Sequence, residues 1–171
     1  MATVNSNLKR KMITIMGLFF LMHAGLLQAH TKVLGWIEDA AITKTHFVIK
    51  AKLDTGADSS SLNAVNAEIV ERGEDNYIKF KVVNRHGQTM EFNEKIVRWT
   101  RIKNKFGAKH KRPVVIIDVC IANILRTVEV NLVDRSNYKY QLLIGRSFLK
   151  GTPNILIDSA LKDSEQPACA Q

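Results

Sequence analysis

The residues best suited to chemistry form the motif Leu53-Asp54-Thr55-Gly56-Ala57, in which a carboxylate is followed by a hydroxyl and a glycine. Because glycine lets the chain turn tightly, the acid can be exposed at the end of the strand that precedes it. An exposed and oriented carboxylate can serve as a general acid or a general base. The same residues also suit an Asx turn before a helix start at Asp58-Ser59-Ser60-Ser61, so the motif alone leaves both interpretations open.

A second motif, Leu142-Leu-Ile-Gly-Arg146, follows about ninety residues later and ends an apolar run with glycine and arginine. Four further short motifs accompany these two: Gly35-Trp36-x-Glu38, Lys50-Ala-Lys-Leu53, Ser61-Leu62-x-Ala64 and Asp134-Arg135. In combination these motifs resemble the retropepsin-like aspartic peptidases. Within that family they resemble a bacterial subfamily labelled ATP-dependent zinc proteases and related to the RimB-type polyglutamate peptidases. The resemblance extends over residues 33–158.

The resemblance implies an all-β, retropepsin-like acid-protease β-barrel with one or two short helices, and the activity of an aspartic endopeptidase. Such an enzyme needs two carboxylates that share one proton, so that one activates a water and the other polarises the scissile carbonyl. The sequence contains one Asp-Thr-Gly, so the second Asp54 is expected from the partner subunit of a twofold homodimer. Thr55 would connect the two loops through hydrogen bonds, and the Gly56 carbonyl would contact the main chain of the substrate.

The resemblance also implies residues that bind substrate around this catalytic motif. An ion pair between Asp58 and Arg146 would support the dimer and the cleft. Arginines near the cleft would favour peptide or protein substrates rich in Glu or Asp. The flap that closes over a bound peptide would be the hairpin 77–97 or the basic segment 98–112. The predicted substrate-binding residues are Ala57, Asp58, Arg98, Arg135 and Arg146.

Neither ATP nor zinc has a matching motif in the sequence. A phosphate-binding Gly-x4-Gly-Lys-Ser/Thr loop is absent, and so is a His-Glu-x2-His zinc motif. No cofactor and no catalytic metal are therefore expected. The histidines beyond the N-terminal segment are expected to be surface residues rather than metal ligands: His30, His46, His86 and His110.

The elements that position these residues are expected to be strands. Ile49, Ala51 and Leu53 alternate with lysines up to the Asp54 motif, which is the period of a strand. Two hairpins are predicted, one joining 77–83 to 89–97 and the other joining 113–121 to 126–133. About eight short strands in all argue for a barrel or a sandwich. The predicted helices are a short one over Ser61–Val70 and a single turn over Arg146–Lys150.

A basic segment runs from Lys95 to Arg112, with eight Lys or Arg residues and no acidic residue. One interpretation is a solvated basic loop. The other is an electrostatic attractor for an acidic polymer. An acidic peptide or surface is favoured over nucleic acid, because Trp99 and Phe106 are the segment's only aromatic residues.

The N-terminal segment predicts export. Lys9-Arg10-Lys11 precedes the mostly apolar stretch 12–27 and the small Ala29, a pattern typical of a signal peptide cleaved after Ala29. A bilayer-spanning helix needs about 20 apolar residues, so membrane contact is expected only through an uncleaved segment. The protein is therefore expected in the periplasm or outside the cell. The predicted organisation is a signal peptide over 1–29, a peptidase domain over 30–158 and a flexible C-terminal tail over 159–171.

The two cysteines leave their pairing open. Cys120 lies in an apolar run and is expected to be buried, whereas Cys169 lies in the polar tail. An intramolecular disulfide and an intermolecular bridge through Cys169 both suit an oxidising compartment.

The whole chain has 171 residues and a net charge of +9, which fits one globular domain with an acidic partner. Two other functions remain open beside the peptidase. One is a non-catalytic module of the same fold that binds a peptide or an envelope polymer. The other is a basic nucleic-acid-binding β-barrel, although no nucleic-acid partner is expected.

Overall fold

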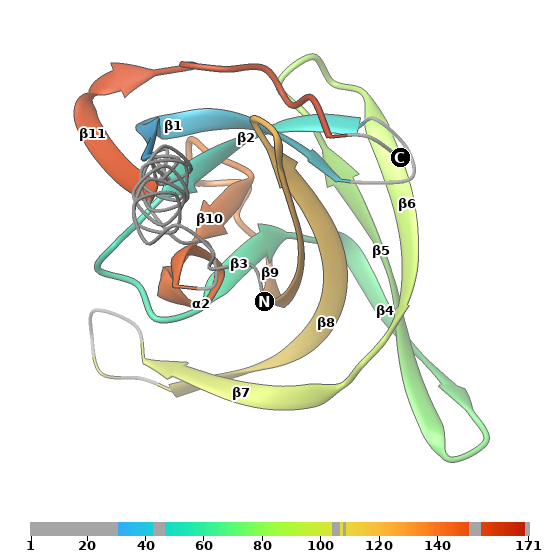
Figure 1. Ribbon diagram of the computed structural model, residues 1–171. Helices are drawn as coiled ribbons and strands as arrows, with labels where there is room; N and C mark the ends of the chain where they lie inside the picture. The colour runs from blue at the N-terminus through green and yellow to red at the C-terminus, as the bar shows by residue number, and fades with distance from the viewer. Residues whose placement is uncertain (1–30, 43–46, 104–106, 108, 151–154, 170–171) are drawn as a thin grey trace, which may run out of the picture. The chain divides into compact units, whose positions relative to one another are not determined.

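The computed structural model describes residues 31–42, 47–103, 107, 109–150 and 155–169 (Figure 1). The predicted signal peptide, residues 1–29, lies outside the described residues. No described helix is long and apolar enough to span a membrane. The described chain is mostly strand with almost no helix, which confirms the all-β prediction.

The described residues form eleven strands, more than the predicted eight. One helical turn, α2 (Arg146–Leu149), matches the predicted turn. The strands are β1 (Lys32–Ile42), β2 (Phe47–Leu53), β3 (Ser60–Asn63), β4 (Val65–Arg72), β5 (Asp75–Val83), β6 (Thr89–Lys95), β7 (Arg98–Lys103), β8 (Lys109–Ile121), β9 (Ile124–Val133), β10 (Leu142–Ile144) and β11 (Ile155–Lys162).

The larger sheet closes on itself. Its order is β11-β1-β2-β10-β3-β9-β8-β7, and an additional pairing between β1 and β8 closes the strands from β1 to β8 in that order into a barrel. The core lies inside, where β8 contributes alternate residues: Val115, Ile117, Val119 and Ile121 are each at most 5% exposed. This alternation is the period of a strand with one face on the core. The predicted β-barrel is therefore present.

Both predicted hairpins are confirmed. β5 pairs with β6 and β8 pairs with β9, each in antiparallel register. Gly87 in the β5–β6 turn has φ +76°, a conformation that glycine adopts readily, and Ala122 in the β8–β9 turn has φ +53°. β4, β5 and β6 form a separate three-stranded sheet.

The helix predicted over Ser61–Val70 is wrong, because these residues lie in β3 and β4. β3 lies between β9 and β10 in the barrel, and its two ladders satisfy the backbone groups that a helix would have satisfied internally. Three of the eight residues of β4 are β-branched (Val65, Ile69 and Val70), and such residues favour strands.

Residues 159–169, expected in a flexible tail, are instead held against the domain. β11 extends to Lys162 and pairs in parallel with β1. Beyond it, Asp163 N–H donates to the Ile37 carbonyl at 2.8 Å. A disulfide joins Cys169 to Cys120, so the structure shows the intramolecular pairing of the two that the sequence left open.

The chain's end also serves a buried carboxylate. Glu38 of β1 is 0% exposed. Its Oε2 accepts the Ser164 N–H at 2.9 Å, and its Oε1 accepts the Ser164 hydroxyl. The end segment thus supplies hydrogen-bond donors that a buried carboxylate requires.

The basic segment is not a loop over its described residues. β7 pairs antiparallel with the first part of β8, with Arg101 opposite Lys111 and Lys103 opposite Lys109. Like charges directly opposite one another destabilise a strand pair. In Figure 1 these strands form a curved ribbon.

Candidate active site

Asp54 lies where β2 ends and the chain turns out of the barrel. β2 and β10 run in parallel, and the Asp54 N–H donates to the Ile144 carbonyl at 2.8 Å. The Gly56 N–H donates to Asp54 Oδ1 at 3.1 Å, which closes the turn predicted from the motif. The Asp54 side chain is 27% exposed. A carboxylate is thus oriented by the backbone and accessible to a reactant.

Arg146 joins the second motif to the first. Its Nη1 donates to the Thr55 carbonyl at 2.9 Å and to the Gly56 carbonyl at 3.0 Å. Its Nη2 pairs with Asp58 Oδ1, which confirms the predicted ion pair. The Gly56 carbonyl, expected to contact substrate, therefore has one lone pair engaged by Arg146 and one remaining.

The backbone of α2 holds Arg146 in this position. The Arg146 N–H donates to the Ala57 carbonyl at 2.8 Å, and the Ser147 N–H donates to the Asp58 carbonyl at 3.0 Å. Phe148 of the same turn is 0% exposed and anchors it in the core. Ala57 and Asp58, both predicted to bind substrate, thus lie in one hydrogen-bonded unit with Arg146.

Gly145 is required by a close approach between the two motifs. A Cβ at this position would lie 2.6 Å from the Ser59 carbonyl oxygen and 3.0 Å from that of Ala57. The Gly145 N–H also donates to Ser60 Oγ at 3.1 Å. The absence of a side chain at Gly145 therefore allows the Asp54 loop to pack against α2.

Lys52 is a site residue that the motif did not indicate. Its Nζ lies 3.0 Å from Asp54 Oδ2, and this hydrogen bond is the main cause that lowers the pKa of Asp54 below its ordinary value. Partial burial opposes the shift, and the Gly56 N–H adds to it. The available signal was the spacing, because residues i and i+2 of a strand point to the same face.

Thr55 and Gly56 are exposed at the end of this loop. The two carboxylates of this loop are both paired with cations, Asp54 with Lys52 and Asp58 with Arg146. An exposed loop of this kind is available for contact with another molecule.

Two predicted substrate-binding arginines do not join this group. Arg98 on β7 forms an ion pair with Glu129 at 2.6 Å. Arg135 is only 9% exposed, and its Nη1 donates to Ser61 Oγ at 2.9 Å. Neither has a described contact with residues 54–58, because each is held by partners on other strands.

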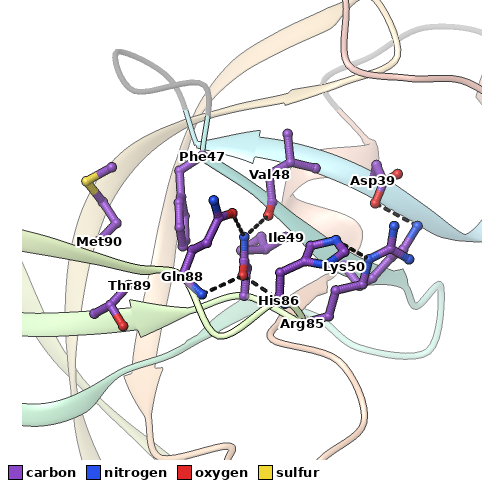
Figure 2. A pocket seen from close by; sticks show the side chains of 11 residues that line it. Asp39, Phe47, Val48, Ile49, Lys50, Arg85, His86, Gln88, Thr89 and Met90 are labelled. Carbon is purple, nitrogen blue, oxygen red and sulfur yellow. Dashed lines mark hydrogen bonds and ion pairs between the residues drawn. The ribbon is translucent and has the colours of Figure 1, made fainter.

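The tip of the hairpin 77–97, one of the two flap candidates, lies away from Asp54. Asn84 Nδ2 donates to the Val48 carbonyl at 3.5 Å, near the start of β2 rather than its end. Figure 2 shows the hairpin turn beside a cavity of about 410 Å³ whose wall includes Phe47, Lys50 and Met90. None of residues 54–58 lines this cavity.

Known proteins similar to this chain fall into three groups. The family described as the RimB-like, retropepsin-like aspartic endopeptidase RimB matches residues 33–167. A protein named probable alpha-L-glutamate ligase from Shewanella pealeana is 30% identical over 101 residues, which cover 57% of this chain and 22% of that protein. One of the same name from Parasynechococcus marenigrum is 27% identical over 113 residues, covering 64% and 24%.

The chain thus spans about a quarter of the length of the curated relatives it matches. Among solved structures, a Legionella pneumophila protein of unknown function (DUF785) is similar with a TM-score of 0.66 and 32% identity. The match covers 79% of this chain and 98% of that one.

Proposed function

Because the chain belongs to the RimB-like family of retropepsin-like aspartic endopeptidases, we propose that it hydrolyses peptide bonds between the two Asp54 side chains of a homodimer. The observation that carries this proposal is the Asp54 carboxylate at the end of β2, oriented by the Gly56 N–H and 27% exposed. The signal-peptide pattern of residues 9–29 supports an exported enzyme that works in the periplasm or outside the cell.

A homodimer supplies the second acid. Peptide hydrolysis by this chemistry uses two carboxyl groups with one shared proton. Each chain has one Asp-Thr-Gly, and its Thr55 and Gly56 lie exposed at the end of the loop. A twofold axis through that loop presents the same residues twice, so both Asp54 side chains meet at the axis.

The two carboxyl groups then have different roles in the reaction. The ionised Asp54 takes a proton from the attacking water, and the protonated one donates a hydrogen bond to the scissile carbonyl. The Lys52 ammonium favours the ionised member of the pair. Arg146 fixes the Thr55 and Gly56 carbonyls that directly follow Asp54, so the loop does not have to reorganise during the reaction.

The relatives support an acidic, Glu-rich substrate. Proteins named probable alpha-L-glutamate ligase contain a segment similar to this chain. A ligase that joins glutamate and a peptidase that cleaves glutamate-rich chains act on the same chemical linkage. Residues 30–171, which remain after the predicted cleavage, contain 22 Lys or Arg against 16 Asp or Glu, and this net charge of +6 also attracts such substrates.

The test is cleavage of oligoglutamate and of a mixed peptide library, followed by mass spectrometry. Wild type should cleave, Asp54→Asn should lose nearly all activity while keeping its circular dichroism spectrum, and Glu74→Gln, which removes an exposed carboxylate elsewhere, should stay active. Sedimentation should find a dimer under assay conditions. Cleavage that survives Asp54→Asn, or that a chelator abolishes, contradicts the mechanism.

One observation favours the non-catalytic alternative, a module of the same fold that binds a peptide or an envelope polymer. The pairing of Lys52 with Asp54 opposes protonation of that carboxyl group, which the shared-proton mechanism requires at one of the two sites. Such a module would bind acidic peptides equally well before and after Asp54→Asn and would cleave none of them.

A further inference from the structure

Arg112 of β8 and Arg135 of the β9–β10 connection are brought together by a pair of neighbouring strands. Ser61 of β3 and Asn131 of β9 are direct partners in the parallel ladder. Arg135 Nη1 donates to Ser61 Oγ at 2.9 Å, and Arg112 Nη1 donates to Asn131 Oδ1 at 3.0 Å. Two guanidinium groups are therefore held by residues directly opposite one another.

The hydrogen bonds of this arginine pair go to neutral groups. Arg135 Nε donates to the Tyr140 carbonyl at 3.4 Å, and its guanidinium lies 4.5 Å from the centre of the Tyr138 ring. Among the residues that the structure describes, neither arginine has a carboxylate within ion-pair distance. Each guanidinium thus keeps its positive charge without an opposite one.

A second buried cation shows how this chain otherwise treats such a charge. Lys50 is 9% exposed, as Arg135 is, but its ammonium pairs with Asp39 at 2.6 Å and also with Asp163. Burial alone would lower the pKa of Lys50, and these two carboxylates raise it instead. The arginine pair lacks such compensation.

Keeping two cations together without an anion costs free energy, because buried charges are normally paired. Burial lowers the pKa of both guanidinium groups. At Arg135 the charge of Arg112 adds to this lowering, against an opposing effect of Tyr138. The attraction of an anion bound between them would offset both penalties.

The arginine pair is connected to the catalytic loop. Asn131 Nδ2 donates to the Ser60 carbonyl at 2.6 Å, and Ser60 Oγ accepts the Gly145 N–H at 3.1 Å. Ser60 begins β3, the strand that directly follows the Asp54 loop. A group bound by the arginines therefore lies beside the strand that leaves the catalytic residues.

We propose that Arg112 and Arg135 form a subsite that binds a side-chain carboxylate of the peptide substrate. The planar guanidinium fork matches the two oxygens of a carboxylate, and two forks at one place select Glu or Asp over their amides. That the bound peptide is a substrate rests on the proposed function. That a carboxylate binds here is inferred from the arrangement of Arg112 and Arg135 alone.

The test measures binding by calorimetry in the Asp54→Asn background, so that no cleavage interferes. The ligands are Glu and Gln hexapeptides with acetylated and amidated ends, which leaves side chains as the only carboxylates. Arg112→Gln is the main variant, because Arg112 has one described side-chain hydrogen bond and lies at the surface more than Arg135. Arg101→Gln is the matched control, because it removes the same charge from the same pair of strands. Arg101 lies opposite Lys111, and Lys111 lies on the opposite face of β8 from Arg112.

Arg112→Gln should weaken binding of the Glu peptide about tenfold to a hundredfold and leave the weak binding of the Gln peptide unchanged. Arg101→Gln should change it by less than about fivefold. Arg135→Lys, which keeps the charge and loses the fork, should also weaken it. Equal effects of Arg112→Gln and Arg101→Gln would overturn the subsite, as would tighter Arg112-dependent binding of oligothymidylate than of the Glu peptide.

A second arm separates this inference from the proposed function. In otherwise wild-type protein, Arg112→Gln should lower the ratio of kcat/KM for Glu over Gln peptides. Cleavage with an unchanged ratio would refute the subsite and leave the peptidase intact. Arg112-dependent binding of the Glu peptide without any cleavage by wild type would refute the peptidase and support the subsite.

Discussion

Lys52 and Asp54 project from the same face at the end of β2, and the Lys52 ammonium donates a hydrogen bond to Asp54 Oδ2 at 3.0 Å. The acid on which the proposed chemistry depends is therefore ionised more readily than an ordinary aspartate. Lys52 of β2 thus favours the ionised form of the proposed catalytic acid.

The first prediction concerns this pairing. Lys52→Met should raise the pKa of Asp54, because the Lys52 hydrogen bond is the main cause that lowers this pKa. At a given acidic pH a smaller fraction of Asp54 is then ionised, so the acidic limb of the activity profile should move to higher pH. Carbon-13 NMR titration of the Asp54 carboxyl group, assigned with Asp54→Asn, measures the shift directly.

The matched control for this prediction is Lys81→Met, which removes a lysine paired with Glu91 in the three-stranded sheet. It should leave the Asp54 titration unchanged.

The pairing also affects the free energy of unfolding: a carboxyl group with a lowered pKa stabilises the fold above its unfolded-state pKa, and this contribution is lost as pH falls through the folded-state value. An Asp54 titration that is identical with and without Lys52 would refute the assignment.

The second prediction concerns Gly145. Gly145→Ala should destabilise the protein by about 1–3 kcal/mol, as overpacking of a tight contact does. The added Cβ would lie 2.6 Å from the Ser59 carbonyl, which is backbone and has no rotamer to change. Urea denaturation measures the loss, and amide shifts should be largest over residues 57–60 and at Arg146. Unchanged stability with unchanged shifts there would mean that the two motifs pack less closely than described.

The third prediction concerns the disulfide. Cys169→Ser should lower the free energy of unfolding by about 4 kcal/mol, from the loop-closure entropy of the unfolded chain. The relevant loop is set by a sequence separation of 49 residues. Wild type treated with a reductant should unfold at the same denaturant concentration as Cys169→Ser. A denaturation midpoint insensitive to both treatments would show that residues 163–169 hold without the covalent link.

Much of the fold was predictable because its signals are local. The hairpins formed by β5 with β6 and by β8 with β9 alternate apolar and polar residues on either side of a recognisable turn. The residues of β3 have no such signal. Their conformation is set by ladders to β9 and β10, strands that lie some seventy or more residues away, and short-range spacing favoured a helix instead.

In the candidate site, too, the residues of local motifs could be predicted and the contacts between distant strands could not. Asp54, Gly145 and Arg146 could be predicted because each belongs to a compact motif. The partners of Arg98 and Arg135 could not be predicted. Glu129 lies on β9, across β8 from the β7 strand of Arg98, and Ser61 lies on β3, so both pairs come together only in the folded sheet. Cation content indicated an acidic partner, but not which cations are already neutralised within the chain.

The position of Glu38 has a consequence for the order of biogenesis. This carboxylate lies in β1, yet the Ser164 groups that donate to it are synthesised 126 residues later. Until then, the Gly35 N–H is its one nearby donor among those described. β1 can therefore be buried with this carboxylate fully hydrogen-bonded only after the segment around Ser164 has been made, so the barrel should close only once that segment is in place.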